Sequence, residues 1–176
     1  MTHEWPVLET ATEYETGWYD GGYDRVEQPD GSTKRYYWAD LPPAVVVVAL
    51  DGDEVVFVEQ YRPTIREECL ELPAGIVEDG ESMVAAAARE LAEETGLRAD
   101  SLEHLQTEHV ATGVLRHERG YVVAESLASG DPDRDDNEYL RVVRRPREEA
   151  IAIAREEPTN DATLQGLLLA SADGHL

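Results

Sequence analysis

The segment AGIVEDGESMVAAAARELAEETGLRAD, residues 74–100, joins a glycine-containing loop to a strongly acidic helical pattern. Its apolar residues recur three and four positions apart, as on the buried face of a helix. Ser82 can cap the start of that helix, and Gly96 stands just past its end, where a left-handed glycine is common. The pattern therefore predicts a helix from about Ser82 to Thr95.

Three glutamates crowd one side of this helix. Because each helical residue turns by about 100°, Glu93 and Glu94 lie about 60° and 40° to either side of Glu90. Like charges at this spacing destabilise a helix, and a cation between them reverses that effect. Mg²⁺ takes oxygen ligands of this kind and adds substrate phosphates to them. The alternative is an ordinary acidic face that is solvated by water.

Apolar runs before this helix predict strands. AVVVVAL (44–50) is a continuous β-branched run, typical of a strand that is buried on both faces. EVVFVEQY (54–61) returns after a DGD turn. A hairpin is predicted between Gly17 and Trp38, with its turn at residues 27–32, whereas residues 1–13 show no clear periodicity.

The second half of the chain shows weaker patterns. Further strands are predicted at residues 69–75, 103–111, 120–127 and 138–145. One helix is predicted at residues 147–157, and another opens at Asn160 or Asp161. The acidic stretch at residues 129–138 is predicted to be a solvated loop.

Composition limits the class of protein. Apolar residues make up 41% of the 176 residues, which is enough for a core. The net charge of −23 argues against a nucleic-acid partner, and no apolar run is long enough to span a membrane. A single cysteine and the lack of a signal-peptide pattern favour the cytoplasm. The charge fits either a generic acidic protein or, as we favour, adaptation to high salt (a halophilic protein).

The acidic helix belongs to a longer spaced pattern. Gly75 is followed six residues later by Glu81, and RELAEETGL follows at residues 89–97. The glycines, the arginine and the apolar positions all stand in register with the glutamates, and together they resemble a complete Nudix box. The resemblance to the Nudix hydrolase superfamily implies an α/β/α sandwich with a mixed central sheet. It also implies an N-terminal β-hairpin extension at residues 1–43, for dimerisation and base binding, before a hydrolase domain at residues 44–176.

The resemblance assigns a role to each charged residue of the box. It implies that Glu90, Glu93 and Glu94 bind Mg²⁺ ions, or Mn²⁺, that bridge a diphosphate, and it places Glu93 among the catalytic residues. Arg89 would pair with Glu81 and hold the metal face in place, because a planar guanidinium grips a carboxylate in a fixed geometry. The metals would neutralise phosphate charge and activate a water molecule.

The flanking segments resemble one subgroup, the ADP-ribose pyrophosphatases. The segment VEQYRPTIREECLELPAG (58–75) is similar to the one that precedes their box. By this likeness Arg62 and Glu71 contact substrate, while Arg66 is either a third contact or a surface arginine. One departure is Thr112, which stands where the subgroup commonly has proline.

The other candidate residues also come from the resemblance. The Ala74 carbonyl is an extra metal ligand by analogy. Glu118 is the candidate general base, with His117 or a box glutamate as the alternative. Trp18 and Trp38 are candidates for stacking the adenine, and the competing interpretation is that these strand aromatics serve packing.

The resemblance implies hydrolysis of ADP-ribose to AMP and ribose 5-phosphate by a homodimer. One alternative keeps the chemistry and changes the substrate to another nucleotide sugar or to a damaged nucleoside triphosphate. Another is a module that binds a nucleotide without cleaving it, and the complete set of metal-binding carboxylates weighs against that function.

Overall fold

The structure is a computed structural model, and it describes residues 4–130 and 139–176. Most of the acidic loop predicted at residues 129–138 lies outside the described residues. The chain divides into two compact units. The first comprises the chain up to Pro43 together with Glu108–Arg119, and the second comprises Ala44–Thr107 and Gly120–Leu176.

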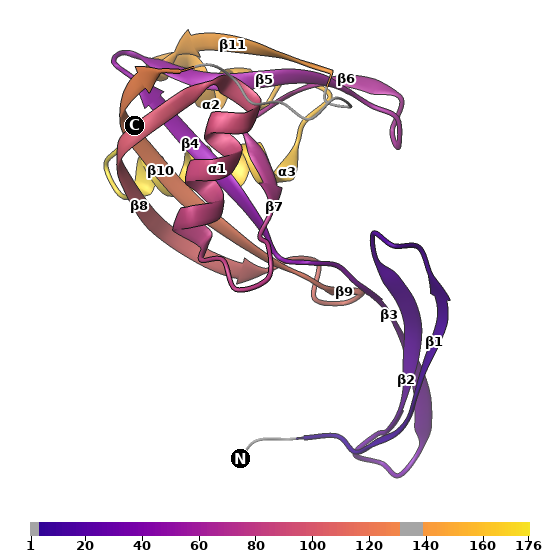
Figure 1. The fold of residues 1–176 in the computed structure, drawn as a ribbon. Coiled ribbons are helices and arrows are strands. Elements are labelled where there is room, and N and C mark those ends of the chain that lie inside the picture. Colours follow the sequence, from indigo (N-terminus) through magenta and orange to yellow (C-terminus); the bar gives the residue numbers. More distant parts are fainter. Residues whose placement is uncertain (1–3, 131–138) are drawn as a thin grey trace. The chain divides into compact units, whose positions relative to one another are not determined.

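The second unit is built on a seven-stranded sheet (Figure 1). Its main path runs in the order β11-β5-β4-β10-β8, while β6 pairs with β5 and β7 pairs with β4. The strands are β4 (Ala44–Asp51), β5 (Glu54–Arg62), β6 (Glu67–Glu71), β7 (Ala74–Ile76), β8 (Leu97–His109), β10 (Glu118–Ser129) and β11 (Leu140–Pro146). The pairs β4–β5, β5–β6, β4–β7 and β11–β5 are antiparallel.

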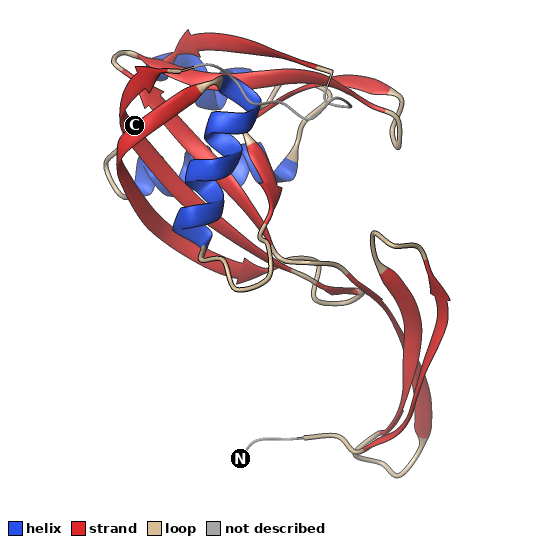
Figure 2. Ribbon diagram, viewed as in Figure 1, coloured by secondary structure: helices blue, strands red, loops and turns tan. Residues whose placement is uncertain are grey.

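Helices cover both faces of this sheet (Figure 2). Helix α1 (Met83–Thr95) lies on one face, and α2 (Ala150–Ile153) and α3 (Asp161–Ala172) lie on the other. The predicted α/β/α sandwich is therefore confirmed.

Strand β4 forms the centre of the core because both of its faces are covered. All residues of 45–50 are at most 3% exposed. Val46 and Val48 pack in a cluster with Leu167 of α3, whereas Val45 packs in a second cluster with Leu91 of α1. A strand that meets helices on both faces has no polar side, which explains its unbroken apolar run.

Both predicted ends of α1 are confirmed. Ser82 Oγ accepts a hydrogen bond from the Ala85 N–H at 3.2 Å, which satisfies one of the free donors of the first turn. Gly96 follows the last helical residue with φ of 71°, and its N–H bonds to the Ala92 carbonyl. These two caps fix where the glutamates stand along the helix.

The first unit contains the predicted hairpin and two strands that the sequence did not indicate, β1 and the short β9. Its sheet has the order β1-β2-β3-β9, formed by β1 (Val7–Glu15), β2 (Asp20–Glu27), β3 (Thr33–Asp40) and β9 (Leu115–Arg116). Eight of the nine residues of β1 are exposed. With so little burial the strand has no alternation of apolar and polar residues, which is the pattern that identifies strands.

The helix predicted at residues 147–157 is shorter than expected. It consists of a 3₁₀ turn at Arg147–Glu149 and then α2, which ends at Ile153. Pro158 follows within a turn and a half, and a proline disfavours helical backbone in the residue before it. No helix in the described part of the chain is both long enough and apolar enough to cross a membrane.

Candidate active site

The candidate site is formed where α1 packs against β7. Gly75 lies in β7 opposite Val45 of β4. A Cβ added to Gly75 would fall within 3.0 Å of all three atoms of the Glu90 carboxyl group, a separation that real Cβ atoms essentially never show. Glycine at this position therefore lets an acidic side chain of the helix lie directly against the strand.

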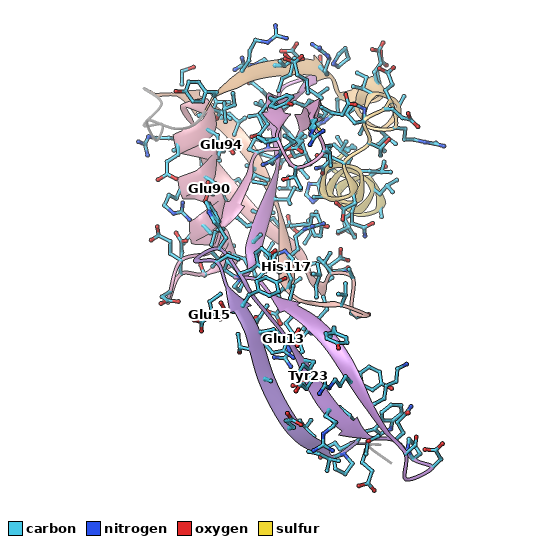
Figure 3. All side chains as sticks on the ribbon, turned by 90° about the vertical axis from the view of Figure 1, so that its right-hand side faces the viewer. Glu13, Glu15, Tyr23, Glu90, Glu94 and His117 are labelled. Atoms are coloured by element: carbon cyan, nitrogen blue, oxygen red, sulfur yellow. The ribbon has the colours of Figure 1, made fainter. Side chains whose placement is uncertain are left out.

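Two of the three glutamates of the helix are buried. Glu90 is 8% exposed and Glu94 is 5% exposed, and they lie one turn apart on α1 (Figure 3). The Ala74 N–H donates a hydrogen bond to Glu94 Oε2 at 3.1 Å. Buried carboxylates are costly unless donors or cations compensate them, so this face of α1 requires positive charge.

Arg89 supplies that charge in the structure. Its Nη1 atom donates to Glu90 Oε1 at 2.8 Å and to Glu93 Oε2 at 2.9 Å. Its Nε and Nη2 atoms bind the two oxygens of Glu81 at 3.2 and 3.0 Å, and Nη2 also reaches the Ile76 carbonyl. The structure thus brings Arg89 and Glu81 together in the fork arrangement that the resemblance implies.

The pKa values of this pair respond to the same contacts. The hydrogen bonds from Arg89 lower the pKa of Glu81 below its ordinary value, and desolvation opposes the shift only in part. The contact with Glu81 raises the pKa of Arg89, with further contributions from Glu90 and Glu93. Both groups are therefore charged across the neutral range.

The donor set of this face suits a hard divalent ion, because it consists of carboxylate oxygens. Among the described residues, no group of three or more histidine, cysteine, aspartate or glutamate side chains is arranged to hold a metal. Glu90 and Glu93 bind Arg89, and Glu94 accepts a hydrogen bond from the Ala74 N–H. The residue types on this face of α1 fit such an ion.

A second charged cluster lies on β5 and β6 of the same unit. The Glu71 side chain is only 4% exposed and forms an ion pair with Arg62, whose side chain is 46% exposed. Arg62 Nε lies 3.0 Å from Glu71 Oε2, and Gln60 Nε2 donates to the same oxygen at 3.0 Å. Asn160 Nδ2 donates to the other oxygen, Oε1, at 2.8 Å.

The Arg62 guanidinium is electrostatically linked to the acidic helix. Burial lowers the pKa of Arg62, but the hydrogen bond and charge of Glu71, together with the charge of Glu94, outweigh it and raise the pKa. Arg66 ends the turn after β5, where it is exposed and adopts a φ of 63°. Its backbone N–H bonds to the Arg62 carbonyl at 2.8 Å, and its predicted contact with substrate stays a prediction.

The two candidates for the general base lie in the first unit. Glu118 is half exposed at the start of β10, and its Oε1 atom lies 3.8 Å from His109 Nδ1. His117 is buried, and its Nδ1 atom lies 2.9 Å from the Pro42 carbonyl. Because a carbonyl only accepts, His117 must hold a proton on Nδ1 in this contact.

The two tryptophans predicted to bind a base have different surroundings. Trp18 is 75% exposed and lines a shallow hollow of the first unit together with Pro42 and Pro43. Trp38 is partly buried, and the Arg116 guanidinium lies over its ring at 4.0 Å from the centroid. One face of the Trp38 ring is thus already covered by a cation.

Sequence reasoning missed two partners of the second cluster. Gln60 and Asn160 both donate to Glu71, but the sequence marked Asn160 only as a residue that opens a helix. Asn160 does cap α3, because its Oδ1 atom accepts from the Thr163 N–H at 2.9 Å. The residues around Asn160 in the sequence indicate that it caps a helix. They contain no information about a contact with a residue that is far away in the chain.

The NUDIX domain model matches residues 40–167, and the chain belongs to this family. The family match and the relatives of this chain support a hydrolase that acts on pyrophosphate bonds. Nudix hydrolases generally use divalent metal ions, which agrees with the oxygen donors on α1.

Several known proteins resemble this chain over most of its length. It is 31% identical over 142 residues to the methanol dehydrogenase activator of Bacillus methanolicus, covering 79% of this chain and 77% of that protein. It is 30% identical over 140 residues to the ADP-ribose pyrophosphatase of Bacillus subtilis (strain 168), covering 78% and 76%. A crystal structure of an ADP compounds hydrolase superimposes with a TM-score of 0.88 at 24% identity, covering 99% of this chain and 98% of that one.

Proposed function

We propose that this protein hydrolyses ADP-ribose to AMP and ribose 5-phosphate in a reaction that depends on Mg²⁺. Water attacks one phosphorus of the diphosphate, the bridging P–O bond breaks, and the other phosphate leaves with its sugar. The name of the Bacillus subtilis relative, ADP-ribose pyrophosphatase, supports this substrate. The sequence similarity extends beyond the box to most of the chain.

One observation carries the substrate proposal. A half-exposed arginine, Arg62, is held by the buried carboxylate of Glu71, and the charge of Glu94 on the acidic helix adds to the raised pKa of Arg62. A substrate whose diphosphate is bound at that helix would then find a cationic group for the part of the molecule beyond it. The acidic helix and this cationic side chain together suit a substrate in which a diphosphate joins two polar groups. We propose that Arg62 and Glu71 form the substrate-binding pair, with Arg66 as an additional contact.

We propose that Glu90, Glu93 and Glu94, with the Ala74 carbonyl, hold Mg²⁺ or in its place Mn²⁺. When bound, the ion supplies charge neutralisation for the diphosphate and a lower pKa for the attacking water. Arg89 keeps Glu90 and Glu93 on one side of the helix, and it is itself fixed by Glu81.

The first unit supplies the remaining candidates. We propose Glu118, whose side chain is half exposed, as the general base, with His117 or a glutamate of the box as the alternative. Trp18 is the stronger candidate for stacking the adenine because its ring is open, whereas Trp38 already contacts Arg116.

We also propose a cytoplasmic homodimer. Exposed aromatic side chains such as Tyr37 and Trp18 on the first unit support a self-association surface there. The single cysteine, Cys69, is buried and needs no oxidising compartment. Light scattering in high-salt buffer tests the assembly, and a monomeric mass would refute it.

One observation favours a second candidate, another nucleotide sugar. Thr112 stands where ADP-ribose enzymes commonly have proline, so the part of the substrate beyond the diphosphate can differ. If the substrate is a nucleotide sugar other than ADP-ribose, the roles proposed for the residues of the acidic helix stay the same.

A substrate panel tests the proposal. ADP-ribose, other nucleotide sugars, NADH, dinucleoside polyphosphates and nucleoside triphosphates are incubated with Mg²⁺ in high-salt buffer, and the products are separated by chromatography. The proposal expects AMP from ADP-ribose at the highest kcat/KM. A higher value for another diphosphate refutes the substrate, release of pyrophosphate identifies a triphosphatase, and inactivity across the panel with varied metal and salt refutes the enzyme.

A further inference from the structure

The carboxylate of Glu71 joins two neighbouring strands, β5 and β6, to the start of α3, which lies 89 residues further along the chain. Arg62 and Gln60 reach it from β5, Glu71 itself ends β6, and Asn160 reaches it from the start of α3. Asn160 uses both ends of its amide, because Oδ1 caps the helix and Nδ2 donates to Glu71. The helix start and the carboxylate are thus connected through one side chain.

The first turn of α3 also forms a hydrogen bond to Leu72, the residue that follows Glu71. The Leu72 N–H donates to Thr163 Oγ1 at 3.0 Å, and Thr163 is 1% exposed. Leu72 precedes Pro73 and Ala74, whose N–H binds Glu94. The first turn of α3 therefore fixes the strip that leads from Glu71 to the acidic helix.

Arg62 is the most exposed group of the Glu71 cluster. Its guanidinium carries a full positive charge and is oriented by Glu71, which uses both of its oxygens to bind it. Glu71 is in turn held by the amide of Asn160, and a carboxylate with fewer donors has more orientations available. Loss of the Asn160 amide would therefore loosen Arg62 without changing any carboxylate of the acidic helix.

We propose that Asn160 is a positioning residue that acts through Glu71 to hold the Arg62 guanidinium toward the substrate. The inference rests on the proposed function in one respect, namely that Arg62 faces a group of the bound substrate. Because Asn160 acts through Glu71, its effect appears in substrate affinity and depends on Arg62.

Asn160→Ser tests this role, because serine keeps a helix cap and removes the amide donor to Glu71. On the best substrate of the panel, KM should rise about tenfold, the effect of one lost hydrogen bond to a charged group, while kcat changes by less than about twofold. Mn²⁺ affinity should stay at the wild-type value. Thr159→Ala is the matched control, since Thr159 bonds only to the neighbouring Arg155 and Glu156 carbonyls in the described structure, and its KM should not change.

The dependence on Arg62 separates positioning from a purely structural effect. If Asn160 acts through Arg62, the variant Arg62→Ala/Asn160→Ser should have the same KM as Arg62→Ala alone. The inference would be overturned if the two KM effects multiplied in the double variant, or if KM were unchanged in Asn160→Ser. A parallel fall of kcat and melting temperature in Asn160→Ser would also overturn it.

Asn160→Asp gives a second readout that a structural role would not produce. It keeps the cap but places a new carboxylate against Glu71, which is also bound by Arg62, so the two carboxylates should share a proton. KM should then rise with pH in this variant and not in Asn160→Ser, and a pH-independent KM would contradict the proposal. If the wild type prefers a substrate other than ADP-ribose, the substrate proposal fails, while these KM ratios on the preferred substrate still decide the role of Asn160.

Discussion

Replacing Gly75 by alanine should disable the site by displacing a single carboxylate. The new Cβ would lie within 3.0 Å of the whole carboxyl group of Glu90. The strand cannot retreat easily, because β7 is paired with β4 through Val45. Glu90 is the flexible partner, so its side chain has to move.

The size of the effect follows from that movement. Ordinary contact with a Cβ begins at 3.4 Å, so the carboxyl group has to retreat by on the order of 1 Å. Metal ligands tolerate only about 0.2 Å, and an error of about 1 Å at a reacting centre costs about 100-fold in rate, or about 2.7 kcal/mol of activation free energy. The movement also breaks the 2.8 Å contact from Arg89 Nη1, and overpacking of this kind lowers the free energy of unfolding by about 1–3 kcal/mol.

Three measurements check the prediction: Mn²⁺ affinity, kcat/KM on the best substrate, and urea unfolding. Gly113→Ala is the control, because a Cβ there meets no atom within 4 Å and its backbone is not left-handed. Glu90→Asp shortens the acidic side chain by about 1.5 Å and should make room, so Gly75→Ala should cost little in that background. The steric explanation would be refuted if the losses of kcat/KM in Gly75→Ala and Glu90→Asp multiplied in the double variant. Wild-type metal affinity in Gly75→Ala would refute it as well.

The remaining predictions concern charge and capping. Glu94→Gln should lower kcat by more than about 100-fold without lowering the melting temperature, since it removes a ligand and relieves repulsion; near-normal turnover would contradict the metal assignment. Ser82→Ala should lower the free energy of unfolding by about 1 kcal/mol, measured by urea denaturation. Because Arg89 lowers the folded-state pKa of Glu81, the stabilisation lost in Glu81→Gln should be complete above the ordinary pKa of 4.5 and should vanish as pH falls through the lower folded value; equal losses at acidic and neutral pH would refute the pair. With a net charge of −23, the melting temperature should rise between low and molar KCl, and a flat profile would argue against salt adaptation.

The sequence predicts those parts of the fold that leave a strong local signal, either a long apolar run or a helix cap. The apolar run of β4 and the caps of α1 are strong local signals, and both elements form where expected. Strand β1 is almost entirely exposed, so nothing in its sequence distinguishes it from a loop. The length of α2 is decided by the chain that follows Ile153, and the helical pattern of residues 147–157 does not contain that information.

The candidate site also has one part that the sequence predicts and another part that it does not predict. Arg89, Glu90 and Glu93 are neighbours on one helix, so their spacing in the sequence already fixes that they meet. The contact between Asn160 and Glu71 joins residues 89 positions apart. Helix propensity and capping predict the start of α3 correctly, but they say nothing about which carboxylate its cap residue reaches.

The chain has few cationic residues, and two of its arginines are held by carboxylates in similar ways. The chain has 38 acidic and 15 basic residues, yet Arg62 and Arg89 are both paired with buried or partly buried carboxylates. At Arg89 one guanidinium compensates Glu81, Glu90 and Glu93 together. Removal of that arginine would leave several carboxylates uncompensated, whereas removal of one carboxylate charge relieves repulsion. Stability and the proposed metal binding on α1 should therefore be separable: substitution of Arg89 should lower both, and substitution of a proposed glutamate ligand should lower metal binding alone.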